Sequence, residues 1–141
     1  MELPHDLLRR QDGVVGRDQL LEAGLTDNDL RRLLRRRDLN VVHPGVYLNH
    51  TGEPTSQQRA WAALRLLWPA ALSHSSALGD LLAATPSSAQ TPLHVAVDRH
   101  RHLHAPRGVV LHHRVDLVDH VLWNLSPPRV RLEDAVIDVA S

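Results

Sequence analysis

Leucine residues recur at helical spacing through the first fifty residues, and breaks separate the repeats. Gly24 ends the second repeat, because glycine tolerates the positive φ found at helix C-termini. Thr26 and Asp29 begin the third repeat in the spacing of a capping box, with Asp in place of the usual Glu. A short extended piece, residues 13–15, separates the first two repeats. The pattern predicts three helices, at residues 4–11, 17–23 and 26–37.

A β-prone segment follows the third helix. Residues 39–43 and 46–49 are separated by Pro44 and Gly45, which predicts a small hairpin. Helix, short strand, helix, three-residue turn, helix and hairpin is the element order of a winged helix-turn-helix, and the turn Gly24-Leu25-Thr26 has the length that this motif uses. The predicted core of this module consists of Leu20, Leu21, Leu25, Leu30, Leu33 and Leu34.

Beyond a Pro/Ser/Thr/Gly-rich linker at residues 51–56, the pattern predicts a second set of elements. Trp61, Leu64 and Trp68 recur at spacings of three and four, which favours a core stripe over a ligand-binding role. The further predicted elements are helices at 56–68, 73–83 and from about 130, extended segments at 70–72, 93–97, 109–113 and 121–125, and a polar loop at 85–91.

The fold class expected from this order is α+β. We expect a winged helix-turn-helix DNA-binding domain at residues 1–50, followed by a small α/β domain at residues 51–141. The last helix presents an apolar face with no later segment to cover it. We therefore expect the full protein to continue beyond Ser141. That apolar face consists of Leu132, Ala135, Val136 and Val139.

Charge enters mainly through its distribution. The chain has 16 basic and 16 acidic residues and no net charge, so bulk charge does not mark it as a nucleic-acid binder. All the basic residues are arginine, which agrees with a GC-rich genome. No cysteine is present, so a disulfide framework is excluded. The apolar runs are shorter than a membrane span and no export leader is visible, and we therefore expect a cytoplasmic protein with no membrane contact.

Five arginines nevertheless gather in the third predicted helix and its end. Leu30, Leu33 and Leu34 share one face of this helix, and the polar residues share the opposite face, as a recognition helix requires. Arginine can pair with guanine or phosphate, and Asn28 can pair with adenine. The alternative is an ordinary solvated helix face. The candidate DNA-binding residues are Asn28, Arg31, Arg32, Arg35, Arg36 and, on the hairpin, His43.

The segment 98–108 is rich in arginine and histidine. His100, His102 and His104 alternate as metal ligands on a strand would, but neighbouring arginines would repel a cation. We expect a basic hairpin loop here and no metal site in the chain. The candidate accessory nucleic-acid contacts are Arg99, Arg101 and Arg107.

Catalytic chemistry is not indicated. Ser73-His74-Ser75 lacks the nucleophile elbow and acid partner of a hydrolase, and helix capping by Ser73 explains it better. A nuclease of the restriction type needs clustered carboxylates and a lysine, and the chain has no lysine. We expect no enzyme and no cofactor.

The chain resembles the AbiEi antitoxin family, which are winged-helix proteins of type IV toxin–antitoxin systems. The segments that carry the resemblance in the first half are Gln19-Leu20-Leu21, Ala23-Gly24-Leu25, the arginine-rich helix and His43-Pro44-Gly45-Val46-Tyr47. Those in the second half are Leu72-Ser73-His74-Ser75-Ser76-Ala77, Leu93-His94-Val95-Ala96-Val97 and residues 127–135. Two positions depart from the family pattern: Gly16 stands where a Ser or Thr cap is frequent, and Asp38 where a Gly is frequent.

The resemblance implies a transcriptional regulator that binds double-stranded DNA at inverted repeats in its own promoter and represses its own synthesis, with a cognate toxin as protein partner. Two other interpretations stay open. The chain could be the DNA-targeting N-terminal part of a restriction-endonuclease-like protein whose catalytic domain lies outside this sequence. Alternatively, the arginine helix could bind an acidic protein.

Overall fold

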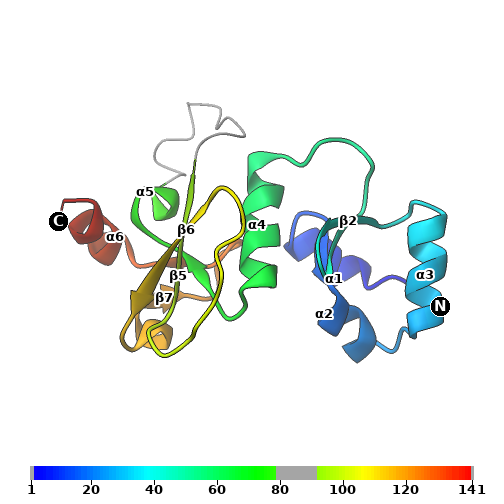
Figure 1. Ribbon diagram of the computed structural model, residues 1–141, viewed down its shortest axis with the longest axis horizontal. Helices are drawn as coiled ribbons and strands as arrows, with labels where there is room; N and C mark the ends of the chain where they lie inside the picture. Colours follow the sequence, from blue (N-terminus) through cyan, green and yellow to red (C-terminus); the bar gives the residue numbers. More distant parts are fainter. Residues whose placement is uncertain (1, 79–91, 141) are drawn as a thin grey trace. The chain divides into compact units, whose positions relative to one another are not determined.

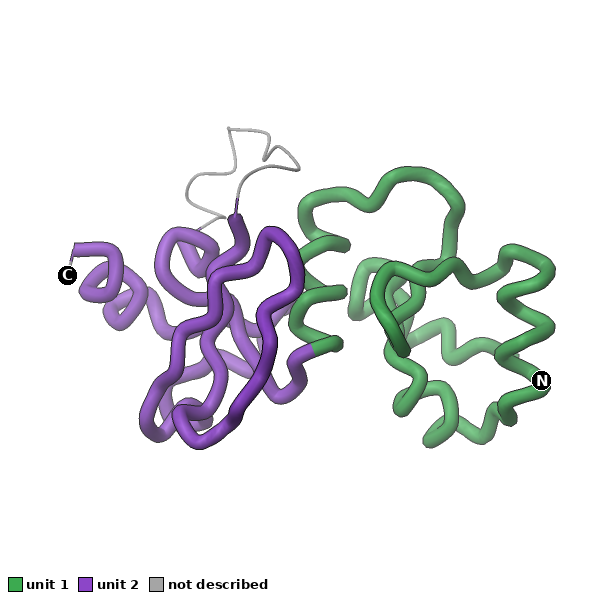
Figure 2. Tube along the Cα trace, in the orientation of Figure 1, with its two compact units in different colours: residues 1–66 green, residues 67–141 purple. Residues whose placement is uncertain are grey.

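The computed structural model describes residues 2–78 and 92–140, which form a mixed α and β fold. The chain divides into two compact units, residues 1–66 and residues 67–141 (Figure 2). Each unit contains its own β-sheet, and each is described by itself below.

The first unit has the element order that the sequence predicts. Its elements are α1 (His5–Arg10), β1 (Val14–Gly16), α2 (Arg17–Glu22), α3 (Asp27–Arg35), β2 (Asn40–His43), β3 (Val46–Leu48) and α4 (Ser56–Leu66), coloured from blue to green in Figure 1. The three strands form an antiparallel sheet in the order β1-β3-β2. Val14 lies opposite Leu48 in this sheet, so the piece between the first two helices joins the hairpin as a third strand.

The first three helices end in the same backbone motif. In each, a residue with positive φ follows the cap, and two N–H groups return to carbonyls of the last turn, which is the Schellman arrangement. The residue with positive φ is Asp12 after α1, Gly24 after α2 and Arg37 after α3. At the end of α3, Asp38 N–H donates to the Leu33 carbonyl at 3.0 Å and Arg37 N–H donates to the Leu34 carbonyl at 3.2 Å. Position 37, which Arg37 occupies, therefore favours glycine. In the family pattern the frequent glycine stands one residue later, where this chain has Asp38.

Arg37→Gly is expected to stabilise the first unit by about 0.5–1 kcal/mol, because a residue with a Cβ is strained at φ +63. Urea unfolding followed by circular dichroism measures the change. Arg36→Gly is the matched control. Because Arg36 has helical dihedrals, glycine at this position should destabilise the first unit by a similar amount. A loss of stability in Arg37→Gly would contradict the prediction.

The capping box predicted at the start of α3 is confirmed. The Thr26 hydroxyl accepts from the Asp29 N–H at 3.2 Å, and the Asp29 carboxylate accepts from the Thr26 N–H at 2.9 Å. The hydrogen bond from the Thr26 backbone is the main reason that the pKa of Asp29 is lowered below 3.8. These contacts fix the residue at which α3 begins.

Thr26→Ala is expected to lower the free energy of unfolding by about 1 kcal/mol, because one orphan N–H of α3 loses its acceptor. A second readout is pH. Because the pKa of Asp29 is lower in the folded chain, its contribution is present above pH 3.8 and declines as the pH falls through the folded value. Urea titrations of wild type and Asp29→Asn at neutral and at acidic pH should therefore converge under acid, and a constant difference would contradict this.

The core of the first unit lies between its helices and the sheet. Leu20, Leu25, Leu30 and Leu33 are buried in it as predicted, and Leu34 packs against it while partly exposed. The prediction for Leu21 was wrong, because this side chain is 38% exposed. Helix α2 has only six residues, and Leu20 is its one buried residue, so Leu21 lies outside the face that packs on the core. The residues that complete the core are Leu8, Val15, Leu39 and Tyr47.

Helix α4 packs with the first unit, against β1 and β3. The Gln58 side-chain amide donates to the Asp12 carbonyl at 2.8 Å, and the Arg65 guanidinium contacts the Asp18 carboxylate at 2.9 Å. Trp61 and Leu64 are buried, which agrees with the core stripe expected from their spacing. The boundary between the compact units therefore follows α4, whereas the domain limit predicted at residues 50 and 51 precedes it.

The second unit is built on a five-stranded sheet in the order β6-β5-β4-β8-β7. Short helices adjoin the sheet, and residues of β4, β5, β8, α5 and α6 share one buried cluster. Its elements are β4 (Ala71–Leu72), α5 (His74–Ala77), β5 (Leu93–Asp98), β6 (Val109–Arg114), the 3₁₀ helix η1 (Leu117–His120), β7 (Val121–Leu122), β8 (Arg129–Val130) and α6 (Leu132–Ala140).

The hairpin predicted around residues 98–108 was wrong. β5 and β6 pair in parallel, with Leu93 opposite Val109 and Asp98 opposite Arg114. The connecting residues 99–108 must therefore return along the length of β5. A six-residue strand is about 20 Å long, and residues 99–108 in an extended form can span it.

Other differences lie at element boundaries. The start of the last helix was predicted near Val130, but Arg129–Val130 form β8 and α6 begins at Leu132. The helix predicted at 73–83 is observed as α5 over its described part, and the loop predicted at 85–91 lies outside the described residues. The outward face of α6 is exposed, with Val136 at 50%. None of the helices in the described ranges reaches the length and apolar character that a membrane span requires.

Candidate DNA-binding surface

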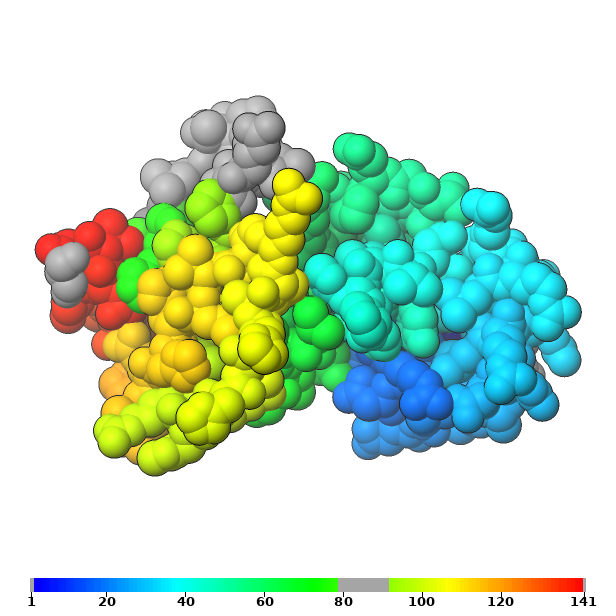
Figure 3. All heavy atoms as spheres, in the orientation of Figure 1, coloured from blue at the N-terminus to red at the C-terminus, as the bar shows by residue number. Residues whose placement is uncertain are grey.

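The outer face of α3 carries the predicted polar residues together. Asn28 lies three and four residues before Arg31 and Arg32, Arg35 lies four and three residues after them, and all four side chains are exposed. Leu30 and Leu33 occupy the buried face of the same helix. In Figure 3, no other segment of the first unit covers the cyan surface of α3. We call these four residues the arginine face.

Ion pairing distinguishes the arginine face from four other arginines of the first unit. Arg9 pairs with Asp6, Arg17 with Asp27, Arg36 with Asp38 and Arg65 with Asp18. Among the described residues, no carboxylate forms an ion pair with Arg31, Arg32 or Arg35. Their guanidinium groups therefore present donors that phosphates and guanine edges can accept, and the Arg32 charge also interacts with the Asp29 carboxylate.

Two acidic residues lie in the first turn of α3, and both are engaged in local contacts. Asp27 is held by Arg17, and the Asp29 carboxylate turns back to the Thr26 N–H in the capping box. Both lie at the helix N-terminus, where negative charge is favourable. The acidic groups are thereby confined to one end of α3, and the arginines occupy its middle and its last turn.

Arg36 and His43 lie at the margin of this surface. Arg36 caps α3, and its ion pair with Asp38 has an Nε–Oδ2 distance of 3.5 Å between two largely exposed side chains. His43 ends β2, next to the turn of Pro44 and Gly45. Burial lowers the pKa of His43, so its ring is neutral at pH 7 and offers a hydrogen bond but no charge.

The three accessory arginines of the second unit differ in their surroundings. The Arg101 guanidinium donates to the carbonyls of Leu67, Trp68 and Pro69 at 2.5–3.1 Å, so it holds the chain before β4. Arg99 and Arg107 are exposed. His100, His102 and His104, on the same segment, do not come together as a cluster of ligand atoms among the described residues.

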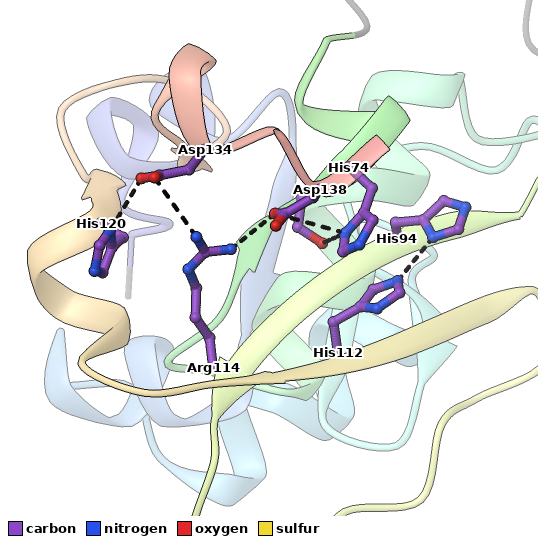
Figure 4. Close-up of polar contacts among 8 residues, drawn as sticks. His74, His94, His112, Arg114, His120, Asp134 and Asp138 are labelled. Atoms are coloured by element: carbon purple, nitrogen blue, oxygen red, sulfur yellow. Dashed lines mark hydrogen bonds and ion pairs between the residues drawn. The ribbon is translucent and has the colours of Figure 1, made fainter. Parts of the chain in front are cut away.

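A different histidine cluster is present that sequence reasoning missed. His74 on α5, His94 on β5 and His112 on β6 lie together, beside Asp138 of α6 (Figure 4). The Arg114 guanidinium lies 2.7 Å from the Asp138 carboxylate and 3.6 Å from the Asp134 carboxylate. The Asp134 carboxylate in turn lies 3.0 Å from His120 Nδ1. The pairing of β5 with β6 brings His94 and His112 together, and α5 and α6 add His74 and Asp138.

The expectation that Ser73 caps α5 through its side chain was wrong. Ser73 occupies the N-cap position, but its hydroxyl contacts the His74 Nδ1 at 3.1 Å, and no backbone N–H of the helix donates to it. The fully buried hydroxyl therefore positions the histidine ring.

Comparison with known protein families gives one match. Residues 3–50 match a family described as transcriptional regulator, AbiEi antitoxin. Comparison with curated proteins found no match. The matched segment contains α1, α2, α3 and the strands β1, β2 and β3, and therefore the whole arginine face. Over residues 3–50 the resemblance inferred from the sequence is confirmed, because this segment is similar to the AbiEi antitoxin transcriptional regulators, whereas the segments of the second half lie outside the match.

Proposed function

We propose that residues 1–50 form a winged helix-turn-helix domain that binds double-stranded DNA through the arginine face, with α4 packed on it and residues 67–141 as a separate α/β unit. The observation that carries this proposal is the row of three exposed arginines on α3, directly opposite its buried leucines. In the described part of the chain, these arginines form no ion pair with a carboxylate. The family match covers the same segment and supports a regulator.

In this proposal α2 and α3 are the helix pair of the motif, and α3 enters the major groove. Residues near the start of a recognition helix contact base edges, so Asn28 is placed to read adenine and Arg31 to read guanine. Arg32, Arg35 and Arg36 follow the groove wall and bind phosphates. The turn at Pro44 and Gly45 is the wing, where His43 donates or accepts a hydrogen bond without charge.

The regulatory role proposed is that of an antitoxin-type autorepressor in the cytoplasm. Helix-turn-helix repressors bind two-fold symmetric sites as dimers, so the operator proposed is an inverted repeat in the protein's own promoter. The protein partner proposed is a cognate toxin. Arg99 and Arg107 are proposed as accessory phosphate contacts, since both are exposed.

Fluorescence anisotropy with the DNA segment upstream of the gene tests the proposal. The wild-type chain should bind this segment more tightly than a shuffled sequence of the same composition, and the affinity for both should fall steeply with salt. No binding at low salt would contradict DNA binding altogether. Equal affinity for the two sequences would contradict the operator and leave only non-specific binding.

Asn28→Ala is expected to weaken binding to the operator by about 1–3 kcal/mol and to leave the affinity for shuffled DNA unchanged. The reason is that a side chain reading a base edge contributes to discrimination, whereas one contacting phosphate contributes to all sequences equally. The ratio of the two dissociation constants measures the effect. Asn124→Ala, the same change at an exposed residue of the second unit, serves as the control, and an unchanged ratio in Asn28→Ala would contradict the role in base reading.

A further inference from the structure

Three imidazole rings face one another on a single side of the second unit's sheet. His94 and His112 lie on neighbouring parallel strands, where Ala96 is opposite His112 and His94 is opposite Val110. Positions 94, 96, 110 and 112 therefore point to the same face of the sheet. His74, the first residue of α5, adds the third ring, and its φ of +51 is unusual for a residue other than glycine. Figure 4 shows the three rings gathered beside Asp138.

The distances within the cluster are short. His94 Nδ1 lies 2.9 Å from His112 Nε2, and the ring centroids of His74 and His112 are 3.7 Å apart. One ring nitrogen from each of the three histidines lies within 4.8 Å of the others. In a tetrahedral site with metal–nitrogen bonds of about 2.0–2.1 Å, the nitrogens are about 3.4 Å apart. Small rotations of the rings from their present stacking would reach that geometry.

We propose that His74, His94 and His112 bind one divalent transition-metal ion, Zn²⁺ foremost. Imidazole nitrogen suits Zn²⁺, Cu²⁺ and Ni²⁺, whereas Ca²⁺ and Mg²⁺ prefer oxygen ligands. The ion takes the position between His94 Nδ1 and His112 Nε2 that a shared proton now holds. The ring that gives up this proton takes one on its other nitrogen, so no net proton is released.

The protonation states agree with this site. Burial lowers the pKa of both His94 and His112, and the neighbouring histidines lower it further. Neutral rings carry the lone pairs that a metal ion needs. The partial burial of all three rings leaves a path for the ion to enter.

The groups around the rings fit the surroundings of a metal site. His74 Nδ1 lies 3.1 Å from the Ser73 hydroxyl and 4.0 Å from the Asp138 carboxylate. These oxygens fix the His74 ring so that Nε2 is the free ligand, in the manner of carboxylate–histidine–zinc arrangements. The nearby cation Arg114 is compensated by Asp138 at 2.7 Å and Asp134 at 3.6 Å. With three protein ligands, the fourth coordination position is open to water.

The full chain, freed of metal by a chelator, is titrated with Zn²⁺ in a calorimeter, and with Co²⁺ while the visible absorption is recorded. We expect one Zn²⁺ per chain and the strong visible bands of tetrahedral Co²⁺. His94→Gln and His112→Gln should each weaken Zn²⁺ binding by more than the roughly 10- to 100-fold that outer partners contribute. Asp138→Asn should stay within that range.

The matched control is His102→Gln together with His104→Gln, which removes two exposed histidines of the 99–108 segment and should leave Zn²⁺ affinity unchanged. Equal losses in the control and in His112→Gln, or no stoichiometric Zn²⁺ binding by wild type, would overturn the proposal. If a substituted chain does not fold, electron paramagnetic resonance of Cu²⁺ bound to wild type decides. Splitting by several imidazole nitrogens supports the site, and a spectrum of oxygen ligation alone overturns it.

Discussion

Replacing Arg31 and Arg35 together by alanine is expected to weaken operator binding at least about 30-fold, because each arginine contact to DNA contributes about 1–3 kcal/mol. The two side chains are one helical turn apart on the exposed face of α3 and have no carboxylate partner among the described residues. Nothing inside the first unit therefore depends on their charge. Anisotropy titrations of the double variant and the wild type on the same operator fragment measure the loss.

The fold of the double variant should be intact. Arg31 and Arg35 are like charges at a spacing of four residues, and alanine has the highest helix propensity, so both changes favour α3. Urea unfolding should therefore give a free energy equal to or above that of the wild type. A weakened and equally stable variant would place the lost interaction in the complex with DNA and not in the folded chain.

The salt dependence distinguishes the kind of contact. If both arginines bind phosphates, the slope of log affinity against log salt should fall by about 1.8, since each phosphate contact contributes about 0.9. If one reads a guanine, the slope falls by about half as much and the discrimination between operator and shuffled DNA falls as well. An unchanged slope together with unchanged discrimination would contradict both roles.

The control is the pair Arg9→Ala and Arg131→Ala, which removes the same charge from α1 and from the segment before α6. Both side chains are exposed, so their loss should leave the chain folded. If this pair weakened binding as much as the α3 pair, the proposed surface would be wrong and general charge would explain the affinity.

Local signals in the sequence were sufficient for most of the first unit. Thr26 and Asp29 fix the start of α3 through two hydrogen bonds within one turn. Gly24, with φ +101, ends the preceding helix, and Pro44 with Gly45 sets the hairpin. Each of these signals involves residues a few positions apart, which is why a pattern along the chain could locate them.

Contacts between distant residues were not visible in the same way. The short strand was predicted at residues 13–15, but its pairing with β3 was not. Gln11 is buried, and its side-chain amide exchanges two hydrogen bonds with the Gln19 amide at 2.9 Å. Arg37 occupies a position that favours glycine, and no local pattern marks it. These features depend on how the elements meet, and the sequence contains no short-range record of that.

The histidine cluster shows the same limit for a candidate site. Attention in the sequence falls on His100, His102 and His104 because they alternate, yet the ligand atoms that gather belong to His74, His94 and His112. A period of two along one strand predicts a shared face only if that segment is a strand, and residues 101–106 have no regular structure. A hairpin closed by residues 98–108 would also have set His94 opposite His112, but no local pattern indicated that His74 of α5 joins them.

The second large effect concerns stability. Leu20→Ala is expected to lower the free energy of unfolding of the first unit by about 2–5 kcal/mol, because its side chain is fully buried among α1, α3 and the sheet and its removal leaves a cavity. A domain of this size has a stability of about 5–15 kcal/mol, so the variant should unfold at a distinctly lower urea concentration.

Leu21→Ala is the matched control, since Leu21 is the next residue of the same helix and is 38% exposed. Both variants replace leucine by alanine in the same helix, so the change in helix propensity is the same. Leu21→Ala should lower the free energy of unfolding by less than about 1 kcal/mol. The difference between the two variants therefore measures packing alone. At temperatures where Leu20→Ala is fully folded, it should bind DNA with wild-type affinity, because α2 presents this residue to the core and not to the arginine face. Leu20→Ala is therefore expected to lose stability and keep DNA binding, whereas the double variant at Arg31 and Arg35 should lose DNA binding and keep stability. If α3 instead bound an acidic protein and not DNA, the two variants would show the same stabilities, but neither would change the affinity for DNA.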